Sequence, residues 1–134
     1  MATMIWSLNI ALHSCDISPE AIIGKGFKIY HSVGIVIGNV RIGENLKIFQ
    51  NVTIGSAVNN REKMIGDNVC LFSGCCVLNK IGDNVVVGAN SVVLDEFPSN
   101  VTIAGIPAKI IKTKKAKLLN KAHIKKMGSL QQGM

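Results

Sequence analysis

The sequence predicts an all-β fold, a parallel β-solenoid of triangular cross-section, and the first reason is a six-residue period of aliphatic residues. A helix repeats its apolar positions every three or four residues and a single strand every second residue, so neither produces this period. Self-similarity at a fixed period is typical of repeat architectures. The period runs through Ile17, Ile23, Ile29 and Ile35, then Ile42, Ile48 and Ile54, then Ile65, Leu71 and Val77, and finally Ile81, Val87 and Val93.

Turn-forming residues between the aliphatic positions are the second reason. Gly and Asn enter the left-handed backbone region at the least cost, so they suit tight corners. Each coil is therefore expected to have three short sides, with a small or aliphatic residue facing inward four positions after each anchor. The corner motifs are Gly-Glu-Asn at 43–45, Gly-Asp-Asn at 66–68 and 82–84, and Gly-Ala-Asn at 88–90; the expected inward residues are Ala21, Val33, Val52, Val69, Cys75, Val85 and Ser91.

Three segments are expected along the chain. Residues 1–14 are apolar and are predicted to form a short helix that caps the open first coil. They lack the basic front and the cleavage site of a signal peptide. Residues 15–108 hold the repeats. Residues 109–134 contain eight lysines and no acidic residue, whereas residues 1–108 are close to neutral, so this tail accounts for the pI of about 9.4 and is predicted to form a basic helix.

Composition argues against several classes of function. No run approaches the roughly 20 apolar residues of a membrane span, and a nucleic-acid site would need a recognisable module or aromatic platforms. The four cysteines, at positions 15, 70, 75 and 76, lack CxxC spacing and matching histidines, so no metal site is expected. Free thiols in a reducing cytoplasm are the simplest interpretation. The tail lysines form a solvated face, or attract coenzyme phosphates or, weakly, an anionic membrane surface.

Five segments of the sequence resemble the hexapeptide-repeat acyltransferases, and specifically their serine acetyltransferase-like branch. The resemblance implies a left-handed parallel β-helix, acetyl-CoA as the acyl donor, and a homotrimer with active sites between neighbouring subunits. The matching segments, within about residues 16–112, are DISPEAIIGKGFKIYHSVGIVIG, IFQNVTIG, IGDNV, VGANSVV and AGIPAKIIK.

The same resemblance implies that His31 and Asp16 form a catalytic pair. In that branch the histidine removes the proton from the acceptor hydroxyl, and the aspartate orients the ring. Such a base is needed because a hydroxyl is a poor nucleophile near neutral pH, where imidazole titrates. From the residues alone, His31 is equally well an ordinary surface histidine. Its separation of fifteen residues from Asp16 places the two on adjacent coils without requiring contact.

The resemblance also implies a slot for acetyl-CoA that is lined by small residues. Small side chains let the thin pantetheine arm lie close to the backbone, and a lysine can pair with a coenzyme phosphate. A plain C-terminal loop is the alternative for the last of these residues. The matching positions are Ser73, Gly74, Gly88, Ala89, Ala104, Gly105 and Lys109.

The sequence departs from serine acetyltransferases at two positions that concern the acceptor. Tyr30 stands where they have an aspartate, and Arg61-Glu62 stands where they have Arg-His. Tyr30, Arg61 and Glu62 are therefore the candidate substrate-binding residues. The loss of both polar partners of serine favours a hydroxyl of a sugar or polysaccharide precursor as the acceptor. L-serine, as in cysteine biosynthesis, is the alternative.

Two further classes of protein also have a β-solenoid fold. A non-catalytic β-solenoid that only binds or assembles is the second alternative, because the second histidine is missing. A zinc enzyme of the β-helical carbonic anhydrase kind needs three histidines across the coils, and His31 is the only one within the repeats.

Overall fold

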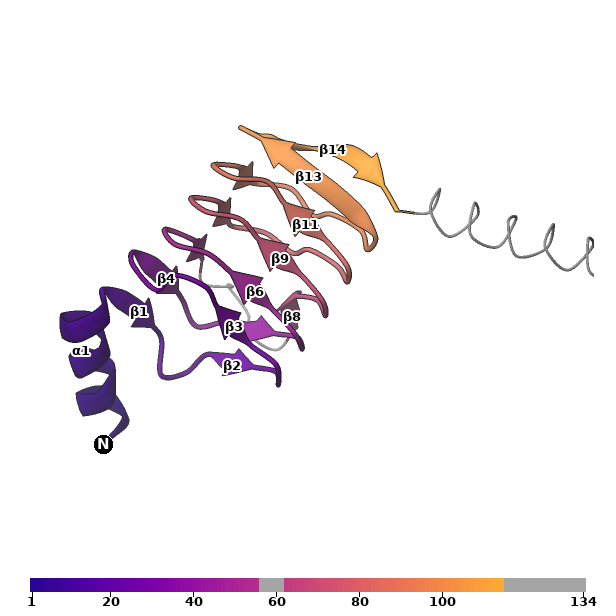
Figure 1. Ribbon diagram of the computed structural model, residues 1–134. Coiled ribbons are helices and arrows are strands. Elements are labelled where there is room, and N and C mark those ends of the chain that lie inside the picture. Colours follow the sequence, from indigo (N-terminus) through magenta and orange to yellow (C-terminus); the bar gives the residue numbers. More distant parts are fainter. Residues whose placement is uncertain (56–61, 115–134) are drawn as a thin grey trace, which may run out of the picture.

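The computed structural model describes residues 1–55 and 62–114, and it is a parallel β-solenoid with one N-terminal helix (Figure 1). The helix α1 spans Ala2–His13. Sheet A contains β1 (Cys15–Ile17), β4 (Ile35–Ile37), β7 (Thr53–Ile54), β10 (Cys76–Val77) and β12 (Val92–Val93). Sheet B contains β2 (Ile22–Ile23), β5 (Arg41–Ile42) and β8 (Lys63–Ile65), continued by single bridges at Ile81 and Phe97. Sheet C contains β3 (Lys28–Ile29), β6 (Lys47–Ile48), β9 (Cys70–Leu71), β11 (Val86–Val87), β13 (Val101–Gly105) and β14 (Ala108–Thr113). The predicted fold class is confirmed.

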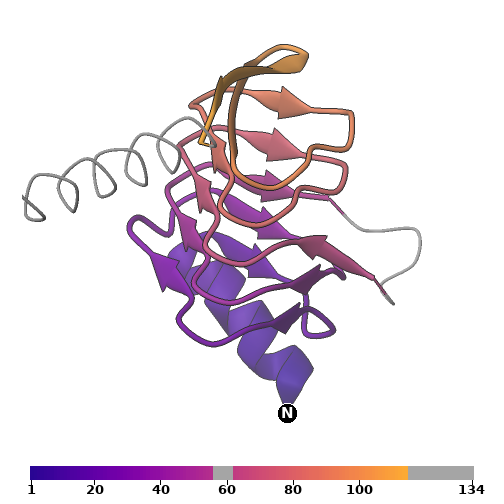
Figure 2. The same cartoon turned by 90° about the vertical axis from the view of Figure 1, so that its right-hand side faces the viewer.

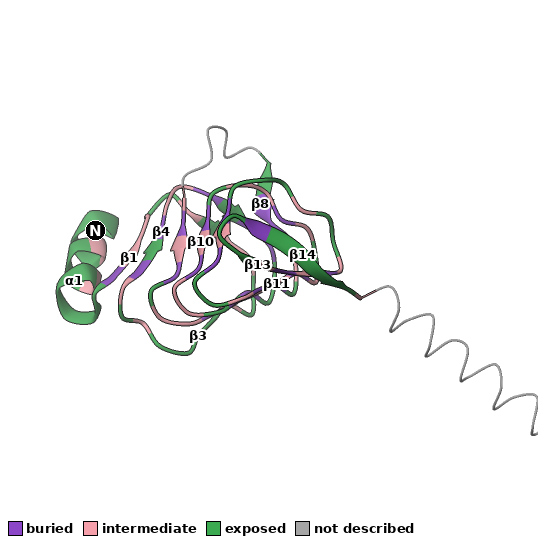
Figure 3. Ribbon diagram, turned by 90° about the horizontal axis from the view of Figure 1, so that it is seen from above, coloured by how far each residue is buried: buried purple, intermediate pink, exposed green. Residues whose placement is uncertain are grey.

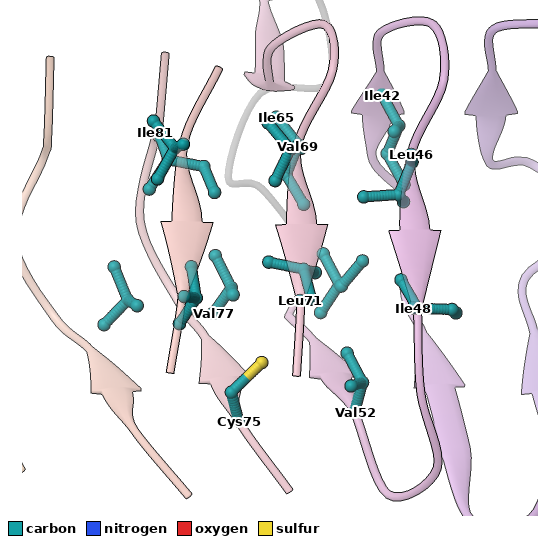
Figure 4. Close-up of a cluster of buried hydrophobic side chains, with 14 of the residues drawn as sticks. Ile42, Leu46, Ile48, Val52, Ile65, Val69, Leu71, Cys75, Val77 and Ile81 are labelled. Atoms are coloured by element: carbon teal, nitrogen blue, oxygen red, sulfur yellow. The ribbon is translucent and has the colours of Figure 1, made fainter. Parts of the chain in front are cut away.

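The six-residue period fills the interior. Ile48, Leu71 and Val87 lie in register on successive strands of sheet C, and all three are fully buried. Figure 4 shows these columns of side chains meeting between the three sheets, and Figure 3 shows the buried residues running through the middle of the solenoid. The positions four after the anchors also face inward, as predicted, at Val52 and Cys75.

One predicted inward residue, Val33, is wrong: it is 62% exposed. Ile29 pairs with Ile48, and Val36 pairs with Thr53. The first coil therefore uses seven residue steps, from 29 to 36, to cover the distance that the next coil covers with five, from 48 to 53. Two extra residues are therefore accommodated in this corner. Ile35, fully buried, takes the inward position opposite Val52 instead of Val33.

The corner between sheets B and C, here called the asparagine edge, comprises residues 43–45, 66–68, 82–84 and 98–100. Its four asparagines, Asn45, Asn68, Asn84 and Asn100, have φ between 55 and 64°. The Gly-x-Asn motifs predict this for the first three, whereas Asn100 follows Pro98-Ser99. The corner between sheets C and A, here called the histidine edge, comprises residues 30–34, 49–51, 72–74 and 88–90. Figure 2 shows the coils seen from the side, with the loops of these corners lying above one another.

The helix α1 lies beside β1 at the first coil. Trp6 Nε1 donates to Asp16 Oδ1 at 2.7 Å, and Asn9 Nδ2 donates to the carbonyl oxygen of Cys15 at 3.0 Å. None of the helix residues is buried, and Ile29 in the first coil remains 38% exposed. An apolar pocket of about 530 Å³ lies between α1 and the first coil.

The last coil is closed by a strand that the sequence did not predict. Residues 109–113, expected in the basic tail, belong to β14, which runs antiparallel to β13. The chain reverses between them at Gly105, whose φ is 107°. Because β13 is the last parallel strand of sheet C, β14 satisfies its open edge. The helix predicted in the tail falls on residues 115–134, outside the described residues. In the described residues, no helix has the length and apolar character needed to cross a membrane.

A candidate active site at the histidine edge

His31 lies immediately beyond β3, in the corner that holds the two extra residues. Its side chain is exposed, and among the described residues it has no hydrogen bond or ion pair. The corner is fixed by its backbone, because Gly34 N donates to the carbonyl oxygen of Ser14 at 2.9 Å. An exposed imidazole without a partner, on a fixed corner, can accept a proton from a bound hydroxyl group.

Asp16 lies on β1, two residues after Ser14, and is half-buried on the outer side of sheet A. Its neighbour in register is Val36 of β4. The structure thus places Asp16 and His31 on segments joined by the Ser14–Gly34 hydrogen bond, but not in a hydrogen bond with each other. Asp16 Oδ1 is occupied by Trp6, which leaves Oδ2 without a partner among the described residues.

The small residues predicted for the coenzyme slot come together on the upper coils. Since Leu71, Val87 and Ile103 are in register, Ser73, Ala89 and Gly105 follow them in one column, and Gly88 and Ala104 form the column beside it. Counting from Ile29 and Ile48, His31 and Gln50 begin the first of these columns. Lys109 pairs with Ala104 across β13 and β14. The small side chains thus begin at Ser73 and form a strip on the upper coils, above His31 and Gln50 in the same column.

Local packing explains why some of these positions must be small. A Cβ atom at Gly88 would lie 2.9 Å from Cβ of Ala104, and one at Gly74 would lie 2.2 Å from Oδ1 of Asn90. Ser91, which is fully buried, holds the strip in place, because its Oγ accepts a hydrogen bond from Gly105 N at 3.1 Å.

Sequence reasoning missed an aromatic stack beside His31. The rings of Tyr30 and Phe49 are 4.7 Å apart with an angle of 8° between their planes, and those of Phe49 and Phe72 are 5.2 Å apart at 15°. Each ring follows an anchor of the six-residue period, so the signal was present in the sequence. The single Tyr30 noted there is thus the end of a three-ring column.

Gln50, also missed, is next to His31 in its column. Its Oε1 is buried and has no hydrogen-bond partner among the described residues. A buried acceptor without a partner is unusual and calls for an explanation. At the histidine edge, this acceptor therefore still lacks a hydrogen-bond donor among the described residues.

The remaining candidates lie elsewhere. Glu62 is exposed and forms an ion pair with Lys80, at the corner between sheets A and B, so within one chain it is on a different edge from His31. Arg61 lies outside the described residues. Burial raises the pKa of the Cys75 thiol to about 12 and also raises the pKa of Cys15 and Cys70. These thiols are protonated at neutral pH and are poor nucleophiles.

Comparison with known proteins shows that the chain has the hexapeptide-repeat β-solenoid fold. The chain is a homologue of the serine acetyltransferases and shares this fold with them. It is 42% identical to the serine acetyltransferase of Staphylococcus epidermidis over 117 residues, which cover 83% of this chain and 55% of the relative. It is 48% identical to that of Staphylococcus aureus over 103 residues, covering 72% and 48%. No protein-family model matches the chain.

Solved structures of serine acetyltransferases have the same fold as this chain. The serine acetyltransferase of Brucella abortus in complex with coenzyme A superimposes with a TM-score of 0.73 at 31% identity, covering 83% of this chain and 47% of that one. The Neisseria gonorrhoeae enzyme in complex with serine gives a TM-score of 0.72 at 28% identity, covering 80% and 46%. The chain spans about half the length of the curated relatives it matches.

Proposed function

We propose that the chain is an acetyl-CoA-dependent O-acetyltransferase with His31 as its general base. The observation that supports this most is the column that begins at the exposed His31 and continues into the strip of small residues Ser73, Ala89 and Gly105. Ser73 lies two coils above His31, with Gln50 between them, so the thioester end of the coenzyme would have to extend past Gln50 to reach the imidazole. The homologous Brucella enzyme binds coenzyme A, which supports the donor.

The reaction follows from the position of His31. Its unprotonated ring nitrogen accepts the proton of the acceptor hydroxyl while the hydroxyl oxygen attacks the thioester carbon. The tetrahedral intermediate collapses with loss of the coenzyme A thiolate, which takes the proton back from the imidazolium. Asp16, through its free Oδ2, is proposed to orient the ring and stabilise the imidazolium. General-base assistance of this kind contributes about 10²–10⁴-fold in rate.

L-serine is the acceptor that the comparisons support. The sequence favoured a sugar, but the relatives at 42% and 48% identity are serine acetyltransferases. Serine thus becomes the first acceptor to test. The second candidate is a sugar hydroxyl, and one observation favours it: Tyr30 and the two rings stacked behind it stand beside the proposed base.

We propose a homotrimer with the active sites between subunits. In one chain, Glu62 and His31 are on different edges, so the loop that includes Glu62 contributes to the site at His31 only if it comes from a neighbouring copy. Light scattering after gel filtration should give three times the monomer mass of 14.3 kDa. A monomer that is fully active would contradict this assembly.

Release of free thiol from acetyl-CoA tests the function directly. The full chain is incubated with acetyl-CoA and with L-serine, hexoses or hexose phosphates as acceptors. Acceptor-dependent release supports the transferase, and the acceptor that gives it decides between the two candidates. Binding of coenzyme A without release leaves the transferase unsupported. Absence of coenzyme A binding, measured by calorimetry, would favour a non-catalytic solenoid.

A further inference from the structure

We propose that the outer surface of sheet C beside His31 binds a phosphorylated sugar, with Tyr30 as the platform for the sugar ring and with Lys28 and Lys47 as the partners of the phosphate. This assignment rests on the acetyl transfer proposed above and narrows its acceptor. Neither lysine belongs to the residues that the sequence pointed to.

The Tyr30 ring is held rigidly on one side and open on the other. Phe49 covers one face at 4.7 Å, and Phe72 supports Phe49 from behind. Among the described residues, β3 is the terminal strand of sheet C, and none of their strands lies beyond Tyr30. The residue is 50% exposed. An aromatic ring with one free face and a hydroxyl at its tip can pack against an apolar ring face and also form a hydrogen bond.

Lys28 and Lys47 form a pair of positive charges without a counter-ion. They are partners in register on β3 and β6, which places their backbones about 4.8 Å apart. Both are exposed, and neither has an ion pair among the described residues. Three other described lysines do have an acidic partner: Lys25 with Glu44, Lys63 with Asp67, and Lys80 with Glu62.

The lysine pair lines a pocket of about 320 Å³, which is more polar than the apolar pocket between α1 and the first coil. Asn45 and Asn68 of the asparagine edge also line it, and Asn45 Nδ2 already donates to Asn68 Oδ1. The two ammonium groups, which have no ion pair among the described residues, suit an anion with several oxygen atoms, and phosphate is such an anion.

The Tyr30 ring and the lysine pair are close enough to bind one ligand. Lys28 and Tyr30 are two residues apart, so they project from the same side of the chain with their Cα atoms about 6–7 Å apart. His31 follows Tyr30 directly. A sugar ring on Tyr30 would thus present a hydroxyl toward His31 while its phosphate reaches the lysine pair. L-serine has no ring face to stack on Tyr30 and no phosphate for the lysine pair.

Calorimetric titration of the full chain with glucose 1-phosphate, galactose 1-phosphate and mannose 1-phosphate tests the surface, with the free hexoses, inorganic phosphate and L-serine as comparison ligands. We expect at least one hexose phosphate to bind at least tenfold more tightly than its free hexose, and the difference to shrink at high salt. The double variant Lys28→Gln/Lys47→Gln should lose at least tenfold in affinity for it, and Tyr30→Leu should lose about tenfold. Lys25→Gln, an exposed lysine that already has Glu44 as its partner, is the matched control and should bind as the unchanged protein does.

The phosphate has a second possible source, coenzyme A, and the same variants distinguish the two. If the lysine variant loses affinity for acetyl-CoA and keeps its affinity for the hexose phosphate, the pocket belongs to the coenzyme and the proposal is overturned. It is also overturned if no hexose phosphate binds more tightly than the free hexose. Serine-dependent thiol release that is unchanged in both the Tyr30 and the lysine variants would overturn it too, while leaving the proposed acetyl transfer intact.

Discussion

The two edges that border sheet C differ in how their polar groups are used. At the asparagine edge the side chains bond to the next coil. Asn45 Nδ2 donates to Asn68 Oδ1 at 3.1 Å, and Asn84 Nδ2 donates to Asn100 Oδ1 at 3.0 Å. Backbone N–H groups donate to the side chain of the coil above, as Asp67 N does to Asp83 Oδ1 at 2.7 Å. This edge is repetitive, and its hydrogen-bonding groups are largely satisfied within the chain.

At the histidine edge, polar side-chain groups lack hydrogen-bond partners among the described residues. His31 has no hydrogen bond among the described residues, Gln50 Oε1 is buried without a partner, and Tyr30 keeps one ring face open. The two extra residues of its corner also break the register that the other coils keep. Local departures from the rules that stabilise a fold are expected where the protein meets a ligand. We therefore expect substitutions within the asparagine edge to act mainly on stability and replacement of His31 to act mainly on acetyl transfer, and the following changes test that division.

The largest effect is expected at the histidine edge, on activity. Replacing His31 with Ala should lower the turnover of acetyl-CoA by about 10²–10⁴-fold, because the general base is lost. The melting temperature should stay nearly constant, since the exposed imidazole has no hydrogen bond or ion pair among the described residues. Thiol release and thermal unfolding measure the two quantities. His13→Ala, an exposed histidine at the end of α1, is the control, and equal rates in both variants would contradict the assignment.

The next effect is expected at the asparagine edge, on stability. A Cβ atom at Gly66 would lie 2.5 Å from the backbone C and O atoms of Gly82, which cannot move without displacing a coil. Gly66→Ala should therefore destabilise the protein by about 1–3 kcal/mol or more, as overpacking does. In the control Gly55→Ala the nearest atom to the Cβ atom is Leu78 Cδ2, at 3.0 Å, and that side chain can rotate, while the nearest backbone atom is the carbonyl oxygen of Val77 at 3.6 Å. Urea unfolding compares the two, and equal midpoints would show that the close backbone contact is not what limits the position.

The six-residue period was enough to predict the solenoid, its inward residues and the turning asparagines, because each of these depends on residues close in sequence. It was not enough at Val33, because an insertion shows itself only when hydrogen bonds to another coil fix the register. The pairing of Lys28 with Lys47 was not predicted either, because it too depends on the register between two coils. β14 was missed because a lysine-rich segment resembles a helix, and the open edge of β13 is not visible in the sequence. The aromatic stack was readable, since its rings follow three anchors.

A smaller effect on stability is expected from the stack itself. Phe49 lies between Tyr30 and Phe72, so Phe49→Leu removes two ring contacts at once. Such contacts are worth about 0.5–1.5 kcal/mol each beyond the area they bury, and half-exposed rings should give the low end of that range. Urea unfolding should therefore show a loss of about 1 kcal/mol. A loss as large as that of Gly66→Ala would mean that the histidine edge is also built for stability.

The smallest effect is a pH dependence at the asparagine edge. The hydrogen bond from Glu44 N, at 2.9 Å, and then the one from Lys63 Nζ hold the pKa of Asp67 below its ordinary value of 3.8. A carboxyl group whose pKa is lowered by folding stabilises the protein above the unfolded pKa, and this contribution disappears as the pH falls through the folded pKa. The variant Asp67→Asn should thus lose less stability than the unchanged protein when the pH is lowered from 5 toward 2.

The companion variant Lys63→Gln identifies the cause of that pH dependence. Because the backbone hydrogen bond from Glu44 is the main cause of the lowered pKa, Lys63→Gln should keep most of the acid-dependent loss of stability. Exposed ion pairs contribute little to stability, which points the same way. Urea midpoints measured across the pH range compare the three proteins. If Lys63→Gln abolishes the pH dependence as fully as Asp67→Asn does, the ion pair and not the hydrogen bond between coils sets the charge on this edge.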